Sequence, residues 1–152
     1  MQRPDLDALA PGSALPTLVE GPVTRHTLGL YAGASGDYNP LHIDQDYARR
    51  EAGMPDVFAH GMLSAAYLAR VLTRWVEDPT AIRRLSVRFV AITHIGDEVH
   101  CRATVAGRFL DGGTPCVRLD LRVHNQAGEP RLRGTAVVAV RRSPSSTYED
   151  RI

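Results

Sequence analysis

Residues 60–77, which read HGMLSAAYLARVLTRWVE, decide the fold of this chain. Apolar side chains cover most of the circumference of the helix that this segment predicts, and Arg70, Arg74 and Glu77 form one narrow polar stripe. A helix of this kind is buried on most of its sides. Asp78-Pro79 predicts where the helix ends.

After this helix the hydrophobic period changes from that of a helix to that of a strand. Alternating apolar residues predict strands over 84–91, 99–105, 117–124 and 132–140, and glycine-containing turns separate them at Gly96-Asp97, Asp111-Gly112-Gly113 and Ala127-Gly128. The resulting antiparallel sheet has one apolar face, and only the helix over 60–77 is long enough to cover it. The sequence therefore predicts an α+β fold in which a curved antiparallel sheet wraps one long central helix.

Short elements are predicted before residue 60. They begin with an irregular lead-in over 1–14 and an edge strand over 15–23, which Pro16 and Pro22 interrupt. A first helix is predicted from the cap Thr24 through Ala34, and Gly33 and Gly36 end it. A second helix is predicted from the cap Asp44 through Glu51, and it stops at Gly53. Residues 143–152 are polar and are expected to form a flexible tail.

Composition limits the classes of function. The 152 residues predict one domain spanning 1–152. A formal net charge of +1 gives no global field for nucleic acid or an acidic membrane, and no apolar run reaches membrane-spanning length. The N-terminus lacks the apolar region of a signal peptide, so we expect a cytoplasmic protein. Cys101 and Cys116 match no metal or redox motif and are expected to be small buried hydrophobes.

The stretch SGDYNPLHID, residues 35–44, offers acid–base chemistry. Asp37 and His42 are five residues apart on a turn-rich loop, and Pro40 between them restricts the backbone. Both side chains can therefore point into one pocket and hold a water molecule, with one group taking its proton and the other delivering a proton to a substrate. A turn-forming Asp and a solvated loop His are the structural alternative.

Gly61 lies in the first turn of the long helix, where its N–H has no partner within the helix. The helix dipole favours negative charge at this point, which suits a carbonyl oxygen under attack. Close packing of helix and sheet is the alternative reason for this glycine. His60 is most simply a capping residue that shapes the entry to the helix.

Other site classes fit less well. Asp37, His42, Asp44 and His60 offer oxygen and nitrogen ligands, but none of the usual metal-binding spacings occurs, and we predict no metal. No G-x-S-x-G elbow for a serine hydrolase is present. The remaining histidines are assigned to surface or strand positions. Arg118, Arg122, Arg131 and Arg133 are expected on solvated strand faces.

Together the residues of 35–44, HGML at 60–63 and GDEV at 96–99, with Tyr31-Ala32, Ala48 and Phe89, resemble the MaoC-like, (R)-specific enoyl hydratase family. The resemblance implies a hot-dog fold that dimerises through a sheet edge. It implies that Asp37 and His42 are the catalytic dyad and that the Gly61 N–H polarises a thioester carbonyl. Ser35, Asn39 and His60 are expected to support the loop or bind substrate.

The implied reaction belongs to fatty acid metabolism: water adds reversibly to a trans-2-enoyl thioester of coenzyme A or of acyl carrier protein, giving a (3R)-3-hydroxyacyl thioester. No cofactor is expected. The expected assembly is a homodimer, with a heterodimer as the other possibility. A non-catalytic acyl-binding subunit of a hot-dog heterodimer and a hot-dog thioesterase are the alternatives. Relatives that carry a further polar residue in the central helix differ from this chain, which has apolar residues and Tyr67 over 65–69.

Overall fold

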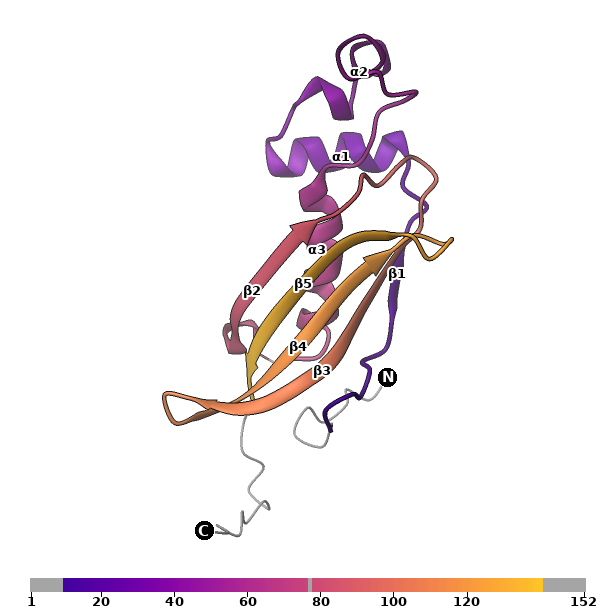
Figure 1. Ribbon diagram of the computed structural model, residues 1–152. Helices are drawn as coiled ribbons and strands as arrows, with labels where there is room; N and C mark the ends of the chain where they lie inside the picture. The colour runs from indigo at the N-terminus through magenta and orange to yellow at the C-terminus, as the bar shows by residue number, and fades with distance from the viewer. Residues whose placement is uncertain (1–9, 77, 141–152) are drawn as a thin grey trace, which may run out of the picture.

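The computed structural model describes residues 10–76 and 78–140. A five-stranded antiparallel sheet curves around helix α3 (Gly61–Thr73), with strands in the order β1 (Leu18–Glu20), β3 (Val99–Asp111), β4 (Thr114–His124), β5 (Pro130–Ala139) and β2 (Ile82–Phe89) (Figure 1). The predicted α+β hot-dog architecture is confirmed. No helix in the described residues is long and apolar enough to cross a membrane.

Helix α3 is the centre of the core, as predicted. Leu68, Val71 and Leu72 are almost completely buried and belong to one cluster with the inward-facing residues of β3, β4 and β5. The helix is shorter than the predicted 60–77, because the Trp75 N–H bonds to the Leu72 carbonyl in a tighter turn that carries Trp75 into the core. The side chain of Met62, expected on the buried surface, is 59% exposed.

The two shorter helices start and end at local signals. Thr24 caps α1 (Arg25–Ser35) by accepting from the Thr27 N–H, and Asp44 caps α2 (Gln45–Ala52) by accepting from the Tyr47 N–H. Gly36 and Gly53 end them in the left-handed conformation that glycine adopts without strain. Gly33, predicted as a second terminator of the first helix, lies inside it.

The N-terminal segment runs beside β3. Its strand β1 is shorter than the predicted 15–23, and Leu18 pairs with Cys101. Residues 10–14 of the predicted lead-in also follow β3, with Ala14 bridged to Thr104. The predicted tail over 143–152 and residues 1–9 lie outside the described residues.

Strand β2 is the open edge of the sheet. It pairs only with β5. The alternation predicted that its apolar residues would be covered, but Leu85 is 40% exposed and Phe89 is 48% exposed. Val90 and Ile92, which follow β2, are also exposed. Such an edge, with unpaired backbone groups and apolar side chains, is suited to pairing with another chain.

The outer face of the sheet carries a row of arginines. Arg102 pairs in register with Arg122, Arg122 with Arg133, and Arg133 with Arg88, so four exposed guanidinium groups cross four adjacent strands. No ion-pair partner for any of the four occurs within residues 10–76 and 78–140. They form the solvated strand face that the sequence predicted for Arg122 and Arg133.

The two cysteines lie on separate strands and are free and buried, as expected. Burial raises the pKa of the Cys101 thiol to about 12, so this thiol stays protonated at neutral pH.

Candidate active site

Hydrogen bonds to its own backbone shape the loop between α1 and α2. The Ser35 hydroxyl donates to the Tyr31 carbonyl over 2.7 Å and accepts from the Asp37 N–H. Asn39 caps the short 3-10 turn η1 (Pro40–His42), since its Oδ1 accepts from the Leu41 N–H over 3.1 Å. Ser35 and Asn39 thus both bond to the loop that carries Asp37 and His42.

His42 is held by one of its ring nitrogens. Nδ1 lies 2.8 Å from the Phe58 carbonyl oxygen and must donate to it, so the neutral ring presents Nε2 as an acceptor. Burial lowers the pKa of His42, and the neighbouring His60 lowers it further, against the opposing effects of the Phe58 carbonyl and Asp37. The imidazole is therefore neutral at pH 7 and able to take a proton.

His60 occupies the N-cap position of α3, as expected, although its side chain makes no capping hydrogen bond. Its Nε2 instead donates to the backbone carbonyl of Asp37 over 3.1 Å. The buried ring lies against His42, with centroids 4.0 Å apart, and against Tyr31 at 5.0 Å. His60 connects the start of the central helix to the Asp37 loop.

The structure brings Asp37, His42 and His60 together. One oxygen or nitrogen atom from each lies within 4.8 Å of the other two. The Asp37 charge also helps burial to raise the pKa of Tyr31. Asp44, the fourth candidate ligand, is used as the α2 cap instead. Such a cluster can move protons, and three ligands could also hold a metal ion, so the absence of a metal stays a prediction.

A cavity of about 310 Å³ opens beside this cluster. His42 and Gly61 both line it, together with an apolar wall formed by Phe58, Ala59, Phe89, Ala91 and Ile92. No acceptor for the Gly61 N–H occurs among the described residues. A Cβ atom on Gly61 would lie 3.1 Å from the Phe89 ring, so the packing reason for this glycine also applies. Asp37 does not line this cavity.

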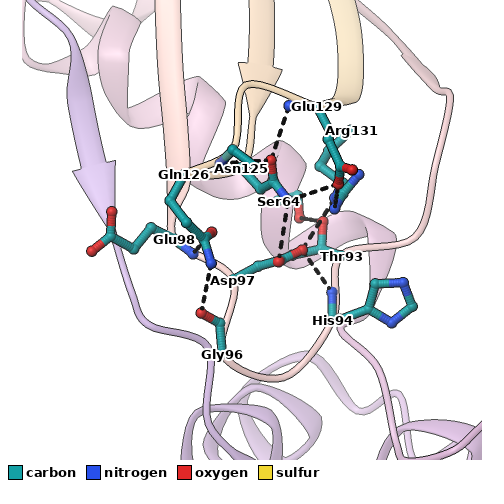
Figure 2. A network of polar contacts seen from close by, with 11 residues as sticks. Ser64, Thr93, His94, Gly96, Asp97, Glu98, Asn125, Gln126, Glu129 and Arg131 are labelled. Atoms are coloured by element: carbon teal, nitrogen blue, oxygen red, sulfur yellow. Dashed lines mark hydrogen bonds and ion pairs between the residues drawn. The ribbon is translucent and has the colours of Figure 1, made fainter.

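Part of the cavity wall is polar. Ser64 and Thr93 are buried, and their hydroxyl oxygens are 3.2 Å apart. Arg131 also lines the cavity, and its Nε donates to Asp97 over 3.1 Å while Nη2 donates to Glu129 over 2.8 Å (Figure 2). The expectation that Arg131 lies on a solvated strand face is wrong, because this ion-paired side chain is only 8% exposed.

Reasoning from the sequence did not identify Ser64, Thr93 or Arg131 as part of the cavity wall. Ser64 follows Gly61 by three residues, so the two lie on one side of α3. That spacing could have placed Ser64 beside Gly61 in the candidate site. Thr93 sits in an irregular segment, and Arg131 meets Asp97 from 34 positions away, so only the tertiary structure shows their place.

Comparisons with known proteins agree with the fold. Residues 8–126 match the family described as "MaoC like domain". The chain is 34% identical over 124 residues to an (R)-specific enoyl-CoA hydratase of Rhodospirillum rubrum, covering 78% of this chain and 80% of that protein.

Solved structures give the same result. An R-hydratase from Pseudomonas aeruginosa has a TM-score of 0.76 and 28% identity, over 90% of this chain and 85% of that chain. The (R)-hydratase from A. caviae has a TM-score of 0.75 and 27% identity, over 88% of this chain and 98% of that chain.

Proposed function

Because the chain belongs to the MaoC-like domain family, we propose that it reversibly hydrates trans-2-enoyl thioesters to (3R)-3-hydroxyacyl thioesters. One observation carries the proposal. The Asp37 and His42 side chains come within 4.8 Å of each other beside a cavity that His42 and Gly61 both line. Two proton-transfer groups and one oxyanion donor are what the addition of water to an enoyl thioester needs.

In the proposed mechanism the thioester carbonyl oxygen accepts the Gly61 N–H. The water oxygen forms a bond to C3, and the electrons of the double bond move toward the carbonyl oxygen, where the helix dipole and this N–H stabilise them. Asp37 and His42 take one proton from the water and return one proton to C2, so the pair ends as it began. The two groups act as a coupled pair, and each proton belongs to the pair.

The two alternatives predict different products. A hot-dog thioesterase would release the free thiol, and a non-catalytic acyl-binding subunit would bind the thioester without changing it. The presence of both Asp37 and His42 favours the hydratase, because a binding subunit has no need for an acid–base pair.

The test uses the purified protein alone with crotonyl-CoA and longer enoyl-CoAs. Loss of the enoyl absorbance with formation of the (3R) alcohol supports the proposal. Release of a thiol would identify a thioesterase. Binding without turnover, followed by activity on adding a second hot-dog subunit, would identify a non-catalytic partner. Parallel assays with acyl-carrier-protein thioesters decide the carrier.

We also propose a homodimer joined along β2, in the cytoplasm. The open edge of β2 and its exposed Leu85 and Phe89 support this assembly, and Phe89 also lines the cavity, so a partner at this edge would cover one of its walls. Light scattering on the purified protein measures the assembly. A monomer that becomes a dimer only with a different subunit would indicate a heterodimer.

A further inference from the structure

The hydroxyl pair of Ser64 and Thr93 is unusual for a cavity that otherwise presents mostly carbon. The two residues are 3% and 5% exposed, and each lines the cavity. Buried hydroxyls are costly unless every donor finds an acceptor. An apolar pair at these two positions would avoid that cost and would pack equally well against a simple hydrocarbon chain.

One of the two hydroxyl protons of Ser64 and Thr93 has no hydrogen-bond acceptor among the described residues. Each hydroxyl has one O–H, and a single hydrogen bond of 3.2 Å joins the two oxygens. Only one of the two O–H groups is used in that bond. No acceptor for the other one occurs in the described part of the chain. The pair therefore has a spare donor and spare lone pairs at the cavity wall.

The surrounding structure holds Thr93 in place. Its backbone carbonyl accepts from the Ala59 N–H over 2.9 Å. The next residue, His94, donates its N–H to Asp97, which also accepts from Arg131 and Asn125 (Figure 2). This network fixes the segment that carries Thr93 to β5 and to the following turn. A pre-positioned hydroxyl loses little freedom when it binds a ligand.

The polar wall carries no net positive charge that would favour an anion. Two carboxylates, those of Asp97 and Glu129, offset the guanidinium of Arg131, and Arg131 in turn lowers the pKa of Glu129. The chemistry of this wall suits a neutral oxygen that can both accept and donate, such as a hydroxyl, better than a carboxylate.

For an acyl chain that runs along α3 from Gly61, the helix geometry gives the position of that oxygen on the chain. Ser64 is three residues beyond Gly61 on α3, which corresponds to ~4.5 Å along the helix axis. At ~1.5 Å per carbon–carbon bond, this length spans about three to four bonds from a thioester carbon held at the Gly61 N–H. The hydroxyl pair therefore lies level with about the fourth or fifth carbon of the chain.

We propose that Ser64 and Thr93 select enoyl thioesters that carry a neutral hydroxyl group a short distance beyond the double bond. This inference rests on the proposed hydratase function, since it places the thioester carbonyl at Gly61. The pair donates one hydrogen bond to the distal hydroxyl through its free O–H and accepts one hydrogen bond from that hydroxyl. The substrate class is thus a polar, hydroxylated short acyl chain.

The test compares trans-2-hexenoyl-CoA with its 5-hydroxy derivative by kcat/KM. We expect the wild-type protein to prefer the hydroxylated substrate by roughly three- to tenfold, the factor that one net hydrogen bond supplies. The double variant Ser64→Ala, Thr93→Val should lose this preference. A wild-type protein that does not prefer the hydroxylated substrate, or a double variant that keeps the preference, overturns the proposal.

Control variants separate specificity from folding. Thr104→Val removes a hydroxyl from β3 on the opposite face of the sheet and should change neither the activity nor the substrate ratio. Thr93→Ser keeps the hydroxyl and should keep the preference. This variant allows the proposal to be tested even if the double variant does not fold.

The binding of saturated thioesters tests the inference without turnover. Calorimetry with 5-hydroxyhexanoyl-CoA and hexanoyl-CoA should show the same preference in the wild-type protein and its loss in the variants. Binding with this preference but no hydration would mean that the proposed reaction is wrong and the specificity is right. Hydration of both enoyl-CoAs at equal rates would mean that the proposed reaction is right and the proposed specificity is wrong.

Discussion

The side chain of His60 donates a hydrogen bond to the backbone carbonyl of Asp37, 23 residues earlier in the chain, over 3.1 Å. The same ring lies 4.0 Å from the ring of His42. His60, at the start of the central helix, thereby holds the loop that carries Asp37 and His42, and its ring also contacts His42 directly. We regard His60 as a positioning residue, because the carbonyl it holds is not a reacting atom.

Removing either proposed proton-transfer group should nearly abolish hydration while the protein stays folded. Asp37→Asn leaves an amide that cannot accept a proton, and His42→Ala removes the imidazole. We expect kcat to fall by ~10² to 10⁴ in each variant. Circular dichroism checks the fold, and Asp46→Asn on exposed α2 is the matched control. A variant that keeps more than about a tenth of the wild-type kcat would remove that residue from the mechanism.

His60 variants should change the pH profile as well as the rate. Burial and the neighbouring His60 lower the pKa of His42 below its ordinary value of about 6.5, so the neutral, proton-accepting form persists at lower pH. The acid limb of kcat/KM in the wild-type protein should therefore lie below about 6.5. His60→Ala should move this limb upward, because it removes an effect that lowers the His42 pKa, and should reduce kcat by ~10- to 10²-fold by releasing the Asp37 loop.

The conservative variant His60→Gln tests the positioning role. A glutamine amide can donate to the Asp37 carbonyl but carries no charge, so it should recover part of kcat while the acid limb stays raised. An unchanged pH profile in both variants would leave His60 with a purely structural role.

Gly61→Val should impair catalysis, because a β-branched side chain would shield the N–H and crowd the carbonyl oxygen. Losing one oxyanion donor costs roughly 10² to 10³ in rate. The Phe89 ring, 3.1 Å from the added Cβ, makes a packing effect possible as well. The variant Gly61→Val, Phe89→Ala removes that contact, and should regain melting temperature without regaining kcat. Recovery of both would assign the oxyanion donor to another N–H.

Activity should survive exhaustive treatment with EDTA. Asp37, His42 and His60 offer ligand atoms within 4.8 Å of one another, but the first two are assigned to proton transfer and His60 Nε2 is used by the Asp37 carbonyl. Elemental analysis of the purified protein accompanies the assay. Stoichiometric metal whose removal stops the reaction would reverse this expectation.

Local signals made much of the fold predictable. Thr24 and Asp44 cap the helices that follow them, because an N-cap hydrogen bond spans only three residues. The period of apolar residues located β2 to β5 and the central helix. The end of that helix was placed too late, because the burial of Trp75 depends on the sheet and not on neighbours in the chain.

The candidate site was predictable in part for the same reason. Asp37, His42 and Gly61 belong to two short motifs, and the structure brings the motifs together as their spacing suggested. The contact of His60 with the Asp37 loop was expected only from the family resemblance, because its partner is a backbone carbonyl, which no side-chain motif reports. Arg131 was wrongly predicted on a solvated face, because the alternation along β5 does not show that Arg131 forms an ion pair with Asp97 of a neighbouring loop.

Four arginines, Arg102, Arg122, Arg133 and Arg88, lie in one row across the sheet. Because of this row, the stability of the sheet should depend on the salt concentration of the solution. Like charges directly opposite one another oppose strand pairing, and they act over a distance that dissolved salt shortens to ~10 Å at 0.1 M. Although the whole chain has a formal charge of only +1, the four arginines concentrate positive charge on this face, which should attract dissolved anions. Ionic strength, which weakens exposed salt bridges in most proteins, should therefore strengthen this sheet.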